Sequence, residues 1–517
     1  MIGQAPHQPG SEGPTGLLST GIGPQIVSSS NRFLKLCAFW SACWGALTLG
    51  IGSFFRALPT LPDTDSYYHL FVARLYGQEG IVDHFPWARF SLLNEAFSDK
   101  ELLFHLLLAP FTFGPAPHLT ARWVLGGLVA LLVCAFSAYG KSLWGRAGLL
   151  VGPICLLLSF DTADRMIRLR PELLSCLLIV AAISAASRQH WRLLGLITAL
   201  FTLAYTAFHA LVGLILLWAI TDHLRGRRVH WQQVLYPLLG AGLALCLHPH
   251  FPNNLLWWKV VAIDVFVGRA EGLDVGSEIF PTNTWKWLQS NGLWIAAVTV
   301  LYFSATKKDL KPGVEPVRER DYLAISAGVF GLLYAMARRF SIYFVPLTIL
   351  SIGAHLAIRQ RRPDLRLKLA GVFPCWAALA IIFMLGIGRS VRVGSALIST
   401  PALPTTEEDW ARFGAAVPEN AKIAAHWGMA QALLYFAPQG LYLNFLDPIL
   451  MVLPYPEVYK ARKALFENRS PDLAYTLAHD LDSDYIAVSG FSNAGLLKNL
   501  ETDPRFMPVF VDFHSLY

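Results

Sequence analysis

A series of long apolar segments constrains the fold of this chain more than any other feature. The segments cover residues 33–55, 119–139, 147–160, 173–187, 193–220, 234–247, 292–305, 322–337, 341–358 and 369–388. We interpret residues 193–220, the longest of them, as a tight pair of helices. With this segment counted twice, we expect an α-helical polytopic membrane protein with about 11 transmembrane helices between residues 33 and 390.

The composition agrees with a membrane protein. Hydrophobic residues make up 54% of the 517 residues and charged residues only 15%, whereas soluble domains carry about a quarter charged residues. The net charge of +7 does not indicate nucleic-acid binding, because the basic residues fall in short clusters between the apolar segments. We therefore expect membrane lipid as a partner and no nucleic acid. All seven cysteines lie in apolar segments and show no spacing typical of disulfide frameworks or zinc sites.

The basic clusters predict how the chain is oriented in the membrane, because cytoplasmic loops carry an excess of Lys and Arg. Alternate loops are basic through Lys141 and Arg146; Arg188 and Arg192; Arg225, Arg227 and Arg228; Lys307, Lys308 and Lys311; and Arg359, Arg361, Arg362, Arg366 and Lys368. The amino terminus is then cytoplasmic. Residues 56–118, 161–172, 248–291, 338–339 and everything after about residue 389 are then external.

Three parts of the chain lie outside the apolar segments. Residues 1–32 are rich in Gly, Pro and Ser, and we expect a disordered cytoplasmic tail. Residues 56–118 form a large first external loop, in which residues 70–76 and 101–111 are too short to span a membrane and predict helices at its interface. Residues 391–517 contain charged residues, turn prolines and a strand-like run at 485–488, which predict a small extracytoplasmic α/β domain.

Two carboxylates, Asp63 and Asp65, follow the first apolar segment, and His69 comes four residues later. Acidic residues at a membrane edge are costly to keep there and are therefore candidates for a functional site. Oxygen ligands at this spacing suit a hard divalent cation such as Mg²⁺ or Mn²⁺. The alternative is an ordinary solvated loop.

A second polar cluster follows the third apolar segment. Asp161 and Asp164 are succeeded by the residues Arg165, Arg168, Arg170 and Glu172. Basic residues are disfavoured in external loops, and arginine suits bidentate contact with phosphate. An internal salt-bridge cluster, in which Arg168 or Arg170 pairs with Asp164 or Glu172, is the competing interpretation.

The remaining candidates also lie on the predicted outer face. His248 and His250 end the seventh span, where a helix-end cap or a hydrogen-bonding role is favoured over metal ligation. Glu278 stands alone among small and apolar residues. Arg338 and Arg339 separate two closely spaced spans, where arginine needs an anionic partner.

Together these residues resemble the catalytic subunit of oligosaccharyltransferase, especially its single-subunit bacterial and archaeal forms, within the GT-C superfamily of membrane glycosyltransferases. Asp65-Ser66-Tyr67-Tyr68-His69-Leu70 is similar to the first acidic motif of that family, and the Asp161–Asp164 region falls where the second one is found. Glu278 resembles the Glu of its Thr/Ser-x-x-Glu motif. Arg339-Phe340 resembles the Arg-Phe that opens a late span and faces the donor pyrophosphate.

The chain differs from the family in the last of these motifs. Ala425-His426-Trp427-Gly428 falls where the family has Trp-Trp-Asp-Tyr-Gly, and His426 takes the place of its Asp. In the family this motif binds the Ser or Thr of the acceptor sequon. The departure argues against ordinary Asn-x-Ser/Thr glycosylation, so N-glycosylation, O-glycosylation and glycolipid synthesis remain open.

The resemblance implies transfer of a sugar or oligosaccharide from a polyprenyl-(pyro)phosphate donor to a protein, glycan or lipid acceptor, at the outer face of a bacterial cytoplasmic (inner) membrane. It implies Mn²⁺ or Mg²⁺ held by Asp65, Asp161 and Glu278, with Asp164 competing with Asp161. It implies donor-phosphate contacts from Arg339, Arg338, Arg168, Arg170 and His69. Supporting roles behind the ligands are expected for Asp63, His248 and His250, and acceptor contacts for His426 and Trp427.

Two alternatives belong to other functional classes. A lipid or glycan transporter or flippase would use the same acids and arginines along a translocation path, although transport sites favour the bilayer midplane within broken helices. A non-catalytic subunit of a glycan assembly complex would retain the fold and lose some of the motifs.

Overall fold

The computed structural model describes residues 23–265, 273, 276–304, 317–359, 372–399, 406–490, 493–512 and 514–517. The expected disorder of residues 1–22 lies outside this part of the chain. So do most of the basic residues in the two loops at 305–316 and 360–371.

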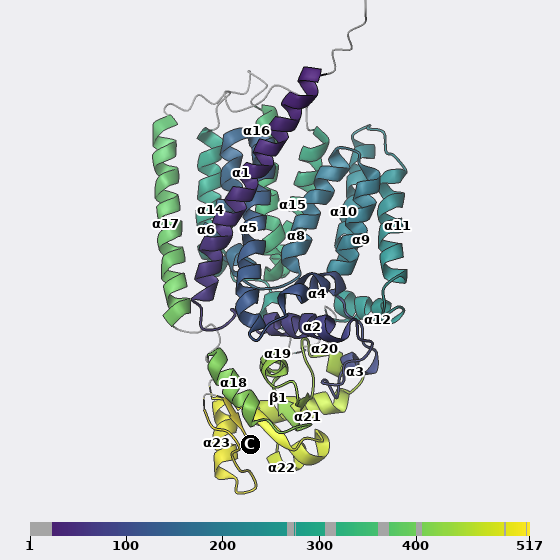
Figure 1. The fold of residues 1–517 in the computed structure, drawn as a ribbon, viewed down its shortest axis with the longest axis vertical. Coiled ribbons are helices and arrows are strands. Elements are labelled where there is room, and N and C mark those ends of the chain that lie inside the picture. The colour runs from purple at the N-terminus through teal and green to yellow at the C-terminus, as the bar shows by residue number, and fades with distance from the viewer. Residues whose placement is uncertain are drawn as a thin grey trace, which may run out of the picture.

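Helices of 7 to 34 residues form a bundle in which most run roughly along the long axis of the molecule (Figure 1). They are α1 (Gly23–Arg56), α5 (Pro117–Trp144), α6 (Val151–Leu157), α8 (Glu172–Ser187), α9 (Trp191–Ala204), α10 (Phe208–Leu224), α11 (Gln232–Cys246), α14 (Thr284–Ser304), α15 (Val317–Met336), α16 (Ser341–Arg359) and α17 (Val372–Ser399). The predicted pair at 193–220 is confirmed as α9 and α10, which are separated by three residues.

Four helical stretches of the described residues are long and apolar enough to cross a membrane: Leu34–Arg56, Pro117–Leu157, Arg338–Leu356 and Trp376–Ile398. Shorter apolar helices, among them α8, α9, α10 and α11, lie beside them in the bundle (Figure 1). The number of about 11 spans stays a prediction.

Helix α1 begins earlier than the sequence suggested, because Gly23–Asn31 are helical rather than part of a disordered tail. Serine and asparagine are only weakly unfavourable in a helix interior. Extending an existing helix fixes one residue for each hydrogen bond gained, whereas starting a new helix is costly. The apolar part of α1 therefore extends the helix into the polar segment that precedes it.

Small residues let two pairs of helices approach closely. A Cβ atom on Gly126 of α5 would lie 2.8 Å from the backbone of Gly52 on α1, and one on Gly240 of α11 would lie 2.2 Å from the carbonyl oxygen of Gly195 on α9. Within a membrane, where lipid is as apolar as the side chains, helices associate through such close packing. Any larger residue at these positions would push the helices apart.

The first predicted external segment folds across one end of the bundle (Figure 1). It contains α2 (Asp65–Glu79), α3 (Leu92–Glu95), α4 (Leu102–Leu108) and the 3₁₀ turn η1 (Ala109–Phe111). The two predicted short helices are thus confirmed as α2 and as α4 with η1. Most of α2 is buried, because the carboxy-terminal region covers its other side.

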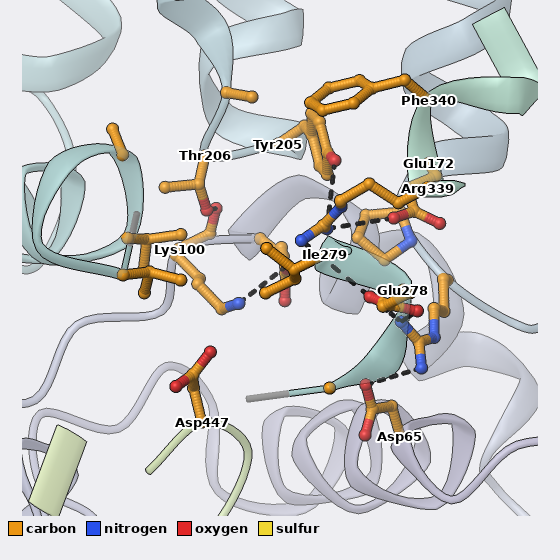
Figure 2. A pocket seen from close by; sticks show the side chains of 18 of the residues that line it. Asp65, Lys100, Glu172, Tyr205, Thr206, Glu278, Ile279, Arg339, Phe340 and Asp447 are labelled. Carbon is orange, nitrogen blue, oxygen red and sulfur yellow. Dashed lines mark hydrogen bonds and ion pairs between the residues drawn. The ribbon is translucent and has the colours of Figure 1, made fainter. Parts of the chain in front are cut away.

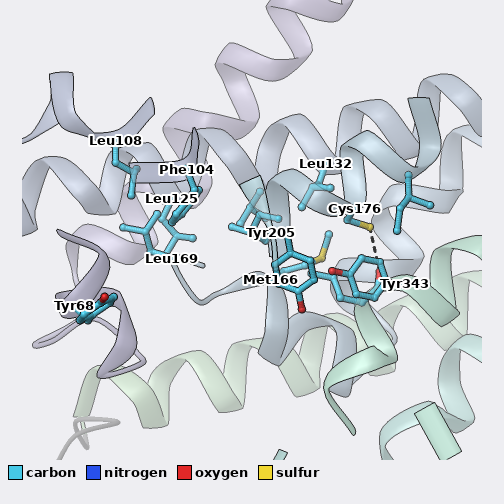
Figure 3. Close-up of a cluster of buried hydrophobic side chains, with 14 of the residues drawn as sticks. Tyr68, Phe104, Leu108, Leu125, Leu132, Met166, Leu169, Cys176, Tyr205 and Tyr343 are labelled. Atoms are coloured by element: carbon cyan, nitrogen blue, oxygen red, sulfur yellow. Dashed lines mark hydrogen bonds between the residues drawn. The ribbon is translucent and has the colours of Figure 1, made fainter. Parts of the chain in front are cut away.

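An apolar core joins this end of the molecule to the bundle. Figure 3 shows it running from Tyr68 of α2 past Phe104 of α4 to Cys176 of α8 and Tyr343 of α16. The Sγ of Cys176 donates to the carbonyl oxygen of Ile342, 3.3 Å away. The core therefore fixes the first segment, α8 and α16 relative to one another.

Short elements connect the bundle helices at both ends. They are η2 (Gly145–Leu150), α7 (Phe160–Met166), α12 (Asn253–Lys259), the π-helical turn η3 (Val260–Asp264), η4 (Ser277–Ile279) and η6 (Arg338–Phe340). Five of these connections, α7, α12, η3, η4 and η6, contribute residues to the candidate site.

The carboxy-terminal region forms a four-stranded sheet in the order β2-β1-β3-β4, with β1 (Lys422–Ala425) parallel to β2 (Leu441–Tyr442) and β3 (Tyr485–Ser489), and β4 (His514–Leu516) antiparallel to β3. The strand predicted at 485–488 is β3. Its helices are α18 (Glu407–Ala416), α19 (Trp427–Phe436), α20 (Ile449–Val452), α21 (Pro456–Phe466), α22 (Leu473–Tyr475), η8 (Thr476–Asp480) and α23 (Ala494–Thr502).

Backbone hydrogen bonds tie this sheet to the first segment. Tyr442 of β2 donates to the carbonyl of Trp87 at 2.7 Å, and Arg89 donates back to the carbonyl of Tyr442 at 2.8 Å. Residues near Ala88 thus extend the edge of the sheet as a parallel bridge. An exposed strand edge readily accepts another segment in this way, and the pairing fixes the sheet over the end of the bundle.

Candidate active site

A cavity of about 650 Å³ lies where the bundle, the first segment and the carboxy-terminal region meet. Its charged part is drawn in Figure 2. Predicted site residues that line it are Asp65, Asp164, Glu278, Asp63, His69, Arg168, Arg170, Arg338, Arg339 and Trp427. Segments separated by hundreds of residues therefore contribute to one site.

Asp63 and Asp65 both contact Arg170. The guanidinium donates to Asp63 from Nε at 2.6 Å and from Nη2 at 2.7 Å, and Nη2 also lies 2.8 Å from Oδ2 of Asp65. Gln431 of α19 donates to the other oxygen of Asp65 at 3.3 Å. Asp65 is the first residue of α2, where the helix dipole favours a negative charge.

The two carboxyl groups differ in acidity. Burial raises the pKa of Asp65 to about 6, and the charges of Asp63 and Glu278 act in the same direction against that of Arg170. Burial would also raise the pKa of Asp63, but Arg170 and Arg168 outweigh it and hold that pKa below its usual value. Asp65 is thus the member of the pair that gains and loses a proton near neutral pH.

Glu278 lies at the centre of a group of arginines. Arg165 pairs with it, Arg170 and Arg168 donate to it at 3.3 and 3.4 Å, and Arg339 lies 3.9 Å away. Burial would raise the pKa of Glu278, but these charges, Arg165 first, hold the pKa well below its usual value. Glu278 is therefore ionised and balances part of their positive charge.

A second carboxylate, Glu172, balances the group from the first turn of α8. It pairs with the buried Arg165 and accepts from Nη2 of Arg339 at 3.1 Å. Arg339 also donates to the hydroxyl of Tyr205 at 3.4 Å (Figure 2). Buried arginines need such partners. The salt-bridge interpretation of this cluster is correct in part, because Arg168 pairs with Asp164 at 2.9 Å.

Asp161 and Asp164 occupy different environments. Asp161 is buried, accepts from the hydroxyl of Tyr334 and from Nε of Arg338 at 2.9 Å, and does not line the cavity. Asp164 lines the cavity and lies 3.5 Å from Arg338. Of the two acids that the sequence left open, Asp164 is the one that faces the site.

Asp65, Asp161 and Glu278 as arranged here do not fit a Mn²⁺ or Mg²⁺ ion. Each carboxylate already pairs with arginine, and a cation would have to displace guanidinium groups of its own charge. Within the described residues, the one group of three His, Cys, Asp or Glu side chains whose ligand atoms lie within 4.8 Å of one another is His69, Glu101 and His105.

The histidines predicted from the sequence have mainly structural roles. His69 is buried, with Nδ1 2.9 Å from Nε2 of His105, and burial holds the pKa of His69 well below its usual value. His248 and His250 do not line the cavity and instead hold the backbone of Asp99, at 3.0 Å each. His426 caps α19 by accepting from the amide of Gly428 at 3.2 Å, and the next residue, Trp427, faces the cavity.

Several cavity residues were not predicted from the sequence, among them Lys100, Glu101, Tyr205 and Asp447. Figure 2 shows Lys100 and Asp447 across the cavity from Asp65 and Glu278, and Tyr205 beside Arg339. Burial raises the pKa of Asp447. Lys100 had one detectable signal, since it is a basic residue in a predicted external loop. Asp447 and Tyr205 belong to no motif or periodic pattern.

Comparison with known proteins places this geometry in context. No protein family model and no curated protein sequence matches the chain. Solved structures do match. The oligosaccharyltransferase AglB from Archaeoglobus fulgidus, in complex with an inhibitory peptide and a dolichol-phosphate, is 11% identical with a TM-score of 0.55, and the match covers 87% of this chain and 69% of AglB.

Two further structures share the arrangement. ArnT from Cupriavidus metallidurans, bound to undecaprenyl phosphate, is 13% identical with a TM-score of 0.54 over 92% of this chain and 97% of ArnT. The arabinofuranosyltransferase AftD from Mycobacteria is 15% identical with a TM-score of 0.50 over 93% of this chain and 40% of AftD. All three are GT-C glycosyltransferases. The chain is an integral membrane protein that has the fold of these three glycosyltransferases, AglB among them.

Proposed function

We propose that the chain is a membrane glycosyltransferase that moves a sugar or oligosaccharide from a polyprenyl-(pyro)phosphate donor to an acceptor in the cavity. The observation that carries this proposal is the division of the cavity into a charged end and an apolar strip. The charged end holds the arginines and acids described above. The strip consists of Ala207, at the N-cap of α10, and Ala210, Gly213, Leu214 and Leu217 on α10, and the other apolar residues that line the cavity include Val261, Ala262, Val265, Val329, Leu333 and Phe340.

The strip suits a polyprenyl chain. The α10 positions recur at helical spacing and line one face over ten residues, which corresponds to about 15 Å at 1.5 Å per residue. Gly213 lies on this face with no heavy atom within 4 Å of where its Cβ would be, so the strip has room for a lipid chain. The face begins beside Tyr205 and Arg339, where the lipid would end in its phosphate.

Arginine at that junction suits the phosphate. Arg339 and Arg168 are partly exposed to the cavity and retain N–H groups for a ligand, while Glu278 and Glu172 keep them in place. Guanidinium groups bind phosphate oxygens in pairs. They would stabilise the negative charge that develops on the phosphate as the bond between the anomeric carbon and the phosphate oxygen breaks.

Asp65 is placed to accept a proton from the acceptor. As the acceptor forms its bond to the anomeric carbon, its hydroxyl or amide group loses a proton, and the phosphate leaves with the bonding electron pair. With a pKa of about 6, Asp65 is mostly ionised at pH 7 and is basic enough to take that proton. Gln431 and Arg170 hold its carboxylate in position.

The acceptor and the side of the membrane are further parts of the proposal. The basic loops favour a cytoplasmic amino terminus and an external cavity. His426 caps α19 and supplies no carboxylate for a sequon hydroxyl, which supports an acceptor other than a plain Asn-x-Ser/Thr peptide. Charged residues of the cavity come from α2 and from the segment just before α20, and these two helices lie at one end of the bundle (Figure 1), which favours an enzyme over a transporter with a midplane site.

Photocrosslinking tests the lipid strip. A photoreactive amino acid at Leu217, which lines the cavity, is compared with one at the neighbouring Leu216, which does not and is similarly exposed. With undecaprenyl phosphate as the lipid, we expect crosslinks at position 217 that excess unlabelled lipid abolishes, and only a background insensitive to excess lipid at 216. Equal crosslinking at both positions would show that the lipid binds elsewhere.

A further inference from the structure

The histidine-rich group in the first segment lies beside the cavity and is not explained by the proposed reaction. His69 on α2, Glu101 at the start of α4 and His105 on α4 are all buried. Nδ1 of His69 lies 2.9 Å from Nε2 of His105 and 3.8 Å from Oε2 of Glu101. We propose that these three side chains form a site for one transition-metal ion, with Zn²⁺ the best fit.

One carboxylate oxygen of Glu101 lacks a hydrogen-bond partner, which supports a bound ion at this position. Its Oε2 is buried and has no hydrogen-bond partner, whereas Oε1 lies 3.3 Å from Nζ of Lys100. A buried carboxylate oxygen without a partner is costly. The oxygen faces the two imidazole rings, and an ion between the three side chains would satisfy it.

Asp99 orients His105 as metal-binding histidines are usually oriented. Oδ2 of Asp99 lies 2.7 Å from Nδ1 of His105, so this nitrogen carries the proton and the lone pair of Nε2 points into the group. Tyr76 donates to the same oxygen at 2.9 Å. A carboxylate behind a ligating histidine fixes its tautomer and raises its basicity.

His248 and His250 complete the support of Asp99. Nδ1 of His250 accepts from the amide of Asp99, and Nε2 of His248 donates to its carbonyl, both at 3.0 Å. The two histidines therefore hold the residue that orients the proposed ligand.

The donor set selects the ion. Two imidazole nitrogens and one carboxylate oxygen are typical of Zn²⁺, whereas Mg²⁺ prefers oxygen ligands throughout. Ligands about 2.05 Å from a tetrahedral zinc lie about 3.3 Å apart. Nδ1 of His69 lies 2.9 Å from Nε2 of His105 and 3.8 Å from Oε2 of Glu101, and these separations bracket the value for zinc. Shifts of a few tenths of an ångström would therefore complete the geometry.

The ion would link α2 to α4 and act on the cavity from its wall. His69, Lys100 and Glu101 all line the cavity. An ion held by Glu101 would fix the backbone next to Lys100 and keep its ammonium group aimed at the space near Asp65 and Asp447 (Figure 2). Three protein ligands also leave one coordination position for water.

Metal analysis of the intact, purified protein tests the proposal without relying on its activity. After removal of metal by a chelator, the protein is titrated separately with Zn²⁺, Mg²⁺ and Mn²⁺, and bound metal and the unfolding temperature are measured. We expect one Zn²⁺ per chain and a higher Tm that a chelator reverses, with no such effect of Mg²⁺. Absence of stoichiometric zinc from the wild-type protein would overturn the proposal.

Variants assign the ligands. Glu101→Gln and His105→Asn keep the size of the side chain approximately and should abolish stoichiometric zinc, whereas Asp99→Asn should weaken binding about 10- to 100-fold. His84→Asn changes an exposed histidine of the same segment and should bind as the wild type does. Co²⁺ absorption bands in the wild type that are absent from Glu101→Gln would support the site, and unchanged zinc in both ligand variants would refute it.

Discussion

Arg170 holds the carboxylate of Asp63 through two parallel hydrogen bonds of 2.6 and 2.7 Å, although the two residues lie 107 positions apart. The same guanidinium contacts Asp65 and Glu278. One arginine therefore joins the segment after α1, the start of α2 and the turn η4. The position of Asp65 in the cavity depends on this junction.

Replacing Arg170 should destabilise the protein. Arg170→Ala leaves Asp63 buried without its partner, which costs about 3–5 kcal/mol for a buried pair, and we expect a clear fall in Tm. The double variant Asp63→Asn/Arg170→Ala should lower the free energy of unfolding by less than the sum of the two single changes. Arg412→Ala removes an exposed arginine that forms surface pairs and should cost at most about 1 kcal/mol.

The Asp63–Arg170 pair also predicts a pH dependence of stability. The pKa of Asp63 is lowered in the folded protein, so its contribution is present above the ordinary pKa of about 3.9 and is lost as the pH falls through the lowered value. The Tm difference between wild type and Asp63→Asn should shrink below about pH 4. A difference that is constant from pH 7 to pH 3 would contradict this assignment.

Asp65 should control the pH dependence of transfer. Because its pKa is raised to about 6 and the ionised form accepts the proton, kcat should fall as the pH drops through about 6. Asp65→Asn should lose transfer by a factor of about 100 or more while retaining donor binding. The exposed Asp83→Asn serves as control, and an Asp65→Asn variant with normal turnover would exclude the proposed base.

Much of this site could be expected from the sequence, for a topological reason. Asp63, Arg170 and Arg339 lie near the ends of apolar segments and Glu278 lies in a loop between two of them, and the alternation of the segments places all four on the same predicted face. The pairings could not be predicted. Asp161 lies next to the same cluster, but its carboxylate turns to Tyr334 and Arg338, which depends on how α7 is rotated about its axis.

Other parts of the site lacked any local signal. Lys100 and Asp447 come from irregular segments, and the two parts of the chain that carry them, the first segment and the carboxy-terminal region, are joined by the pairing beside Tyr442. Hydropathy predicted α9 with α10, the short helices of the first segment and β3. It did not predict the early start of α1, which extends through polar residues once the apolar helix has formed.

His426 should affect transfer and not donor binding. His426→Ala removes the cap of α19, which costs about 1 kcal/mol and disturbs the neighbouring Trp427, so we expect reduced transfer with unchanged lipid affinity. His426→Asn, which keeps a capping side chain, should recover most of the loss. A plain Asn-x-Thr peptide should be a poor acceptor for the wild type, and efficient transfer to it would contradict the acceptor inference.

The orientation of the chain can be tested directly. A reporter fused after Tyr517 should be active only if it works outside the cytoplasm, because the basic loops place the region after residue 389 on the external side. The same reporter after Arg225, in a basic loop, should show the opposite behaviour. A cytoplasmic carboxy terminus would move the whole cavity to the other side of the membrane.

If the arginine end of the cavity binds the phosphate of a polyprenyl lipid, the protein should distinguish undecaprenyl phosphate from undecaprenol. The wild type should bind the phosphate more tightly than the alcohol, and Arg412→Ala should keep that preference. Arg339→Ala should lose most of it, and Arg339→Lys should recover only part, since a point charge cannot reproduce the paired contacts of a guanidinium. An undiminished preference for the phosphate in Arg339→Ala would show that Arg339 does not bind the lipid phosphate.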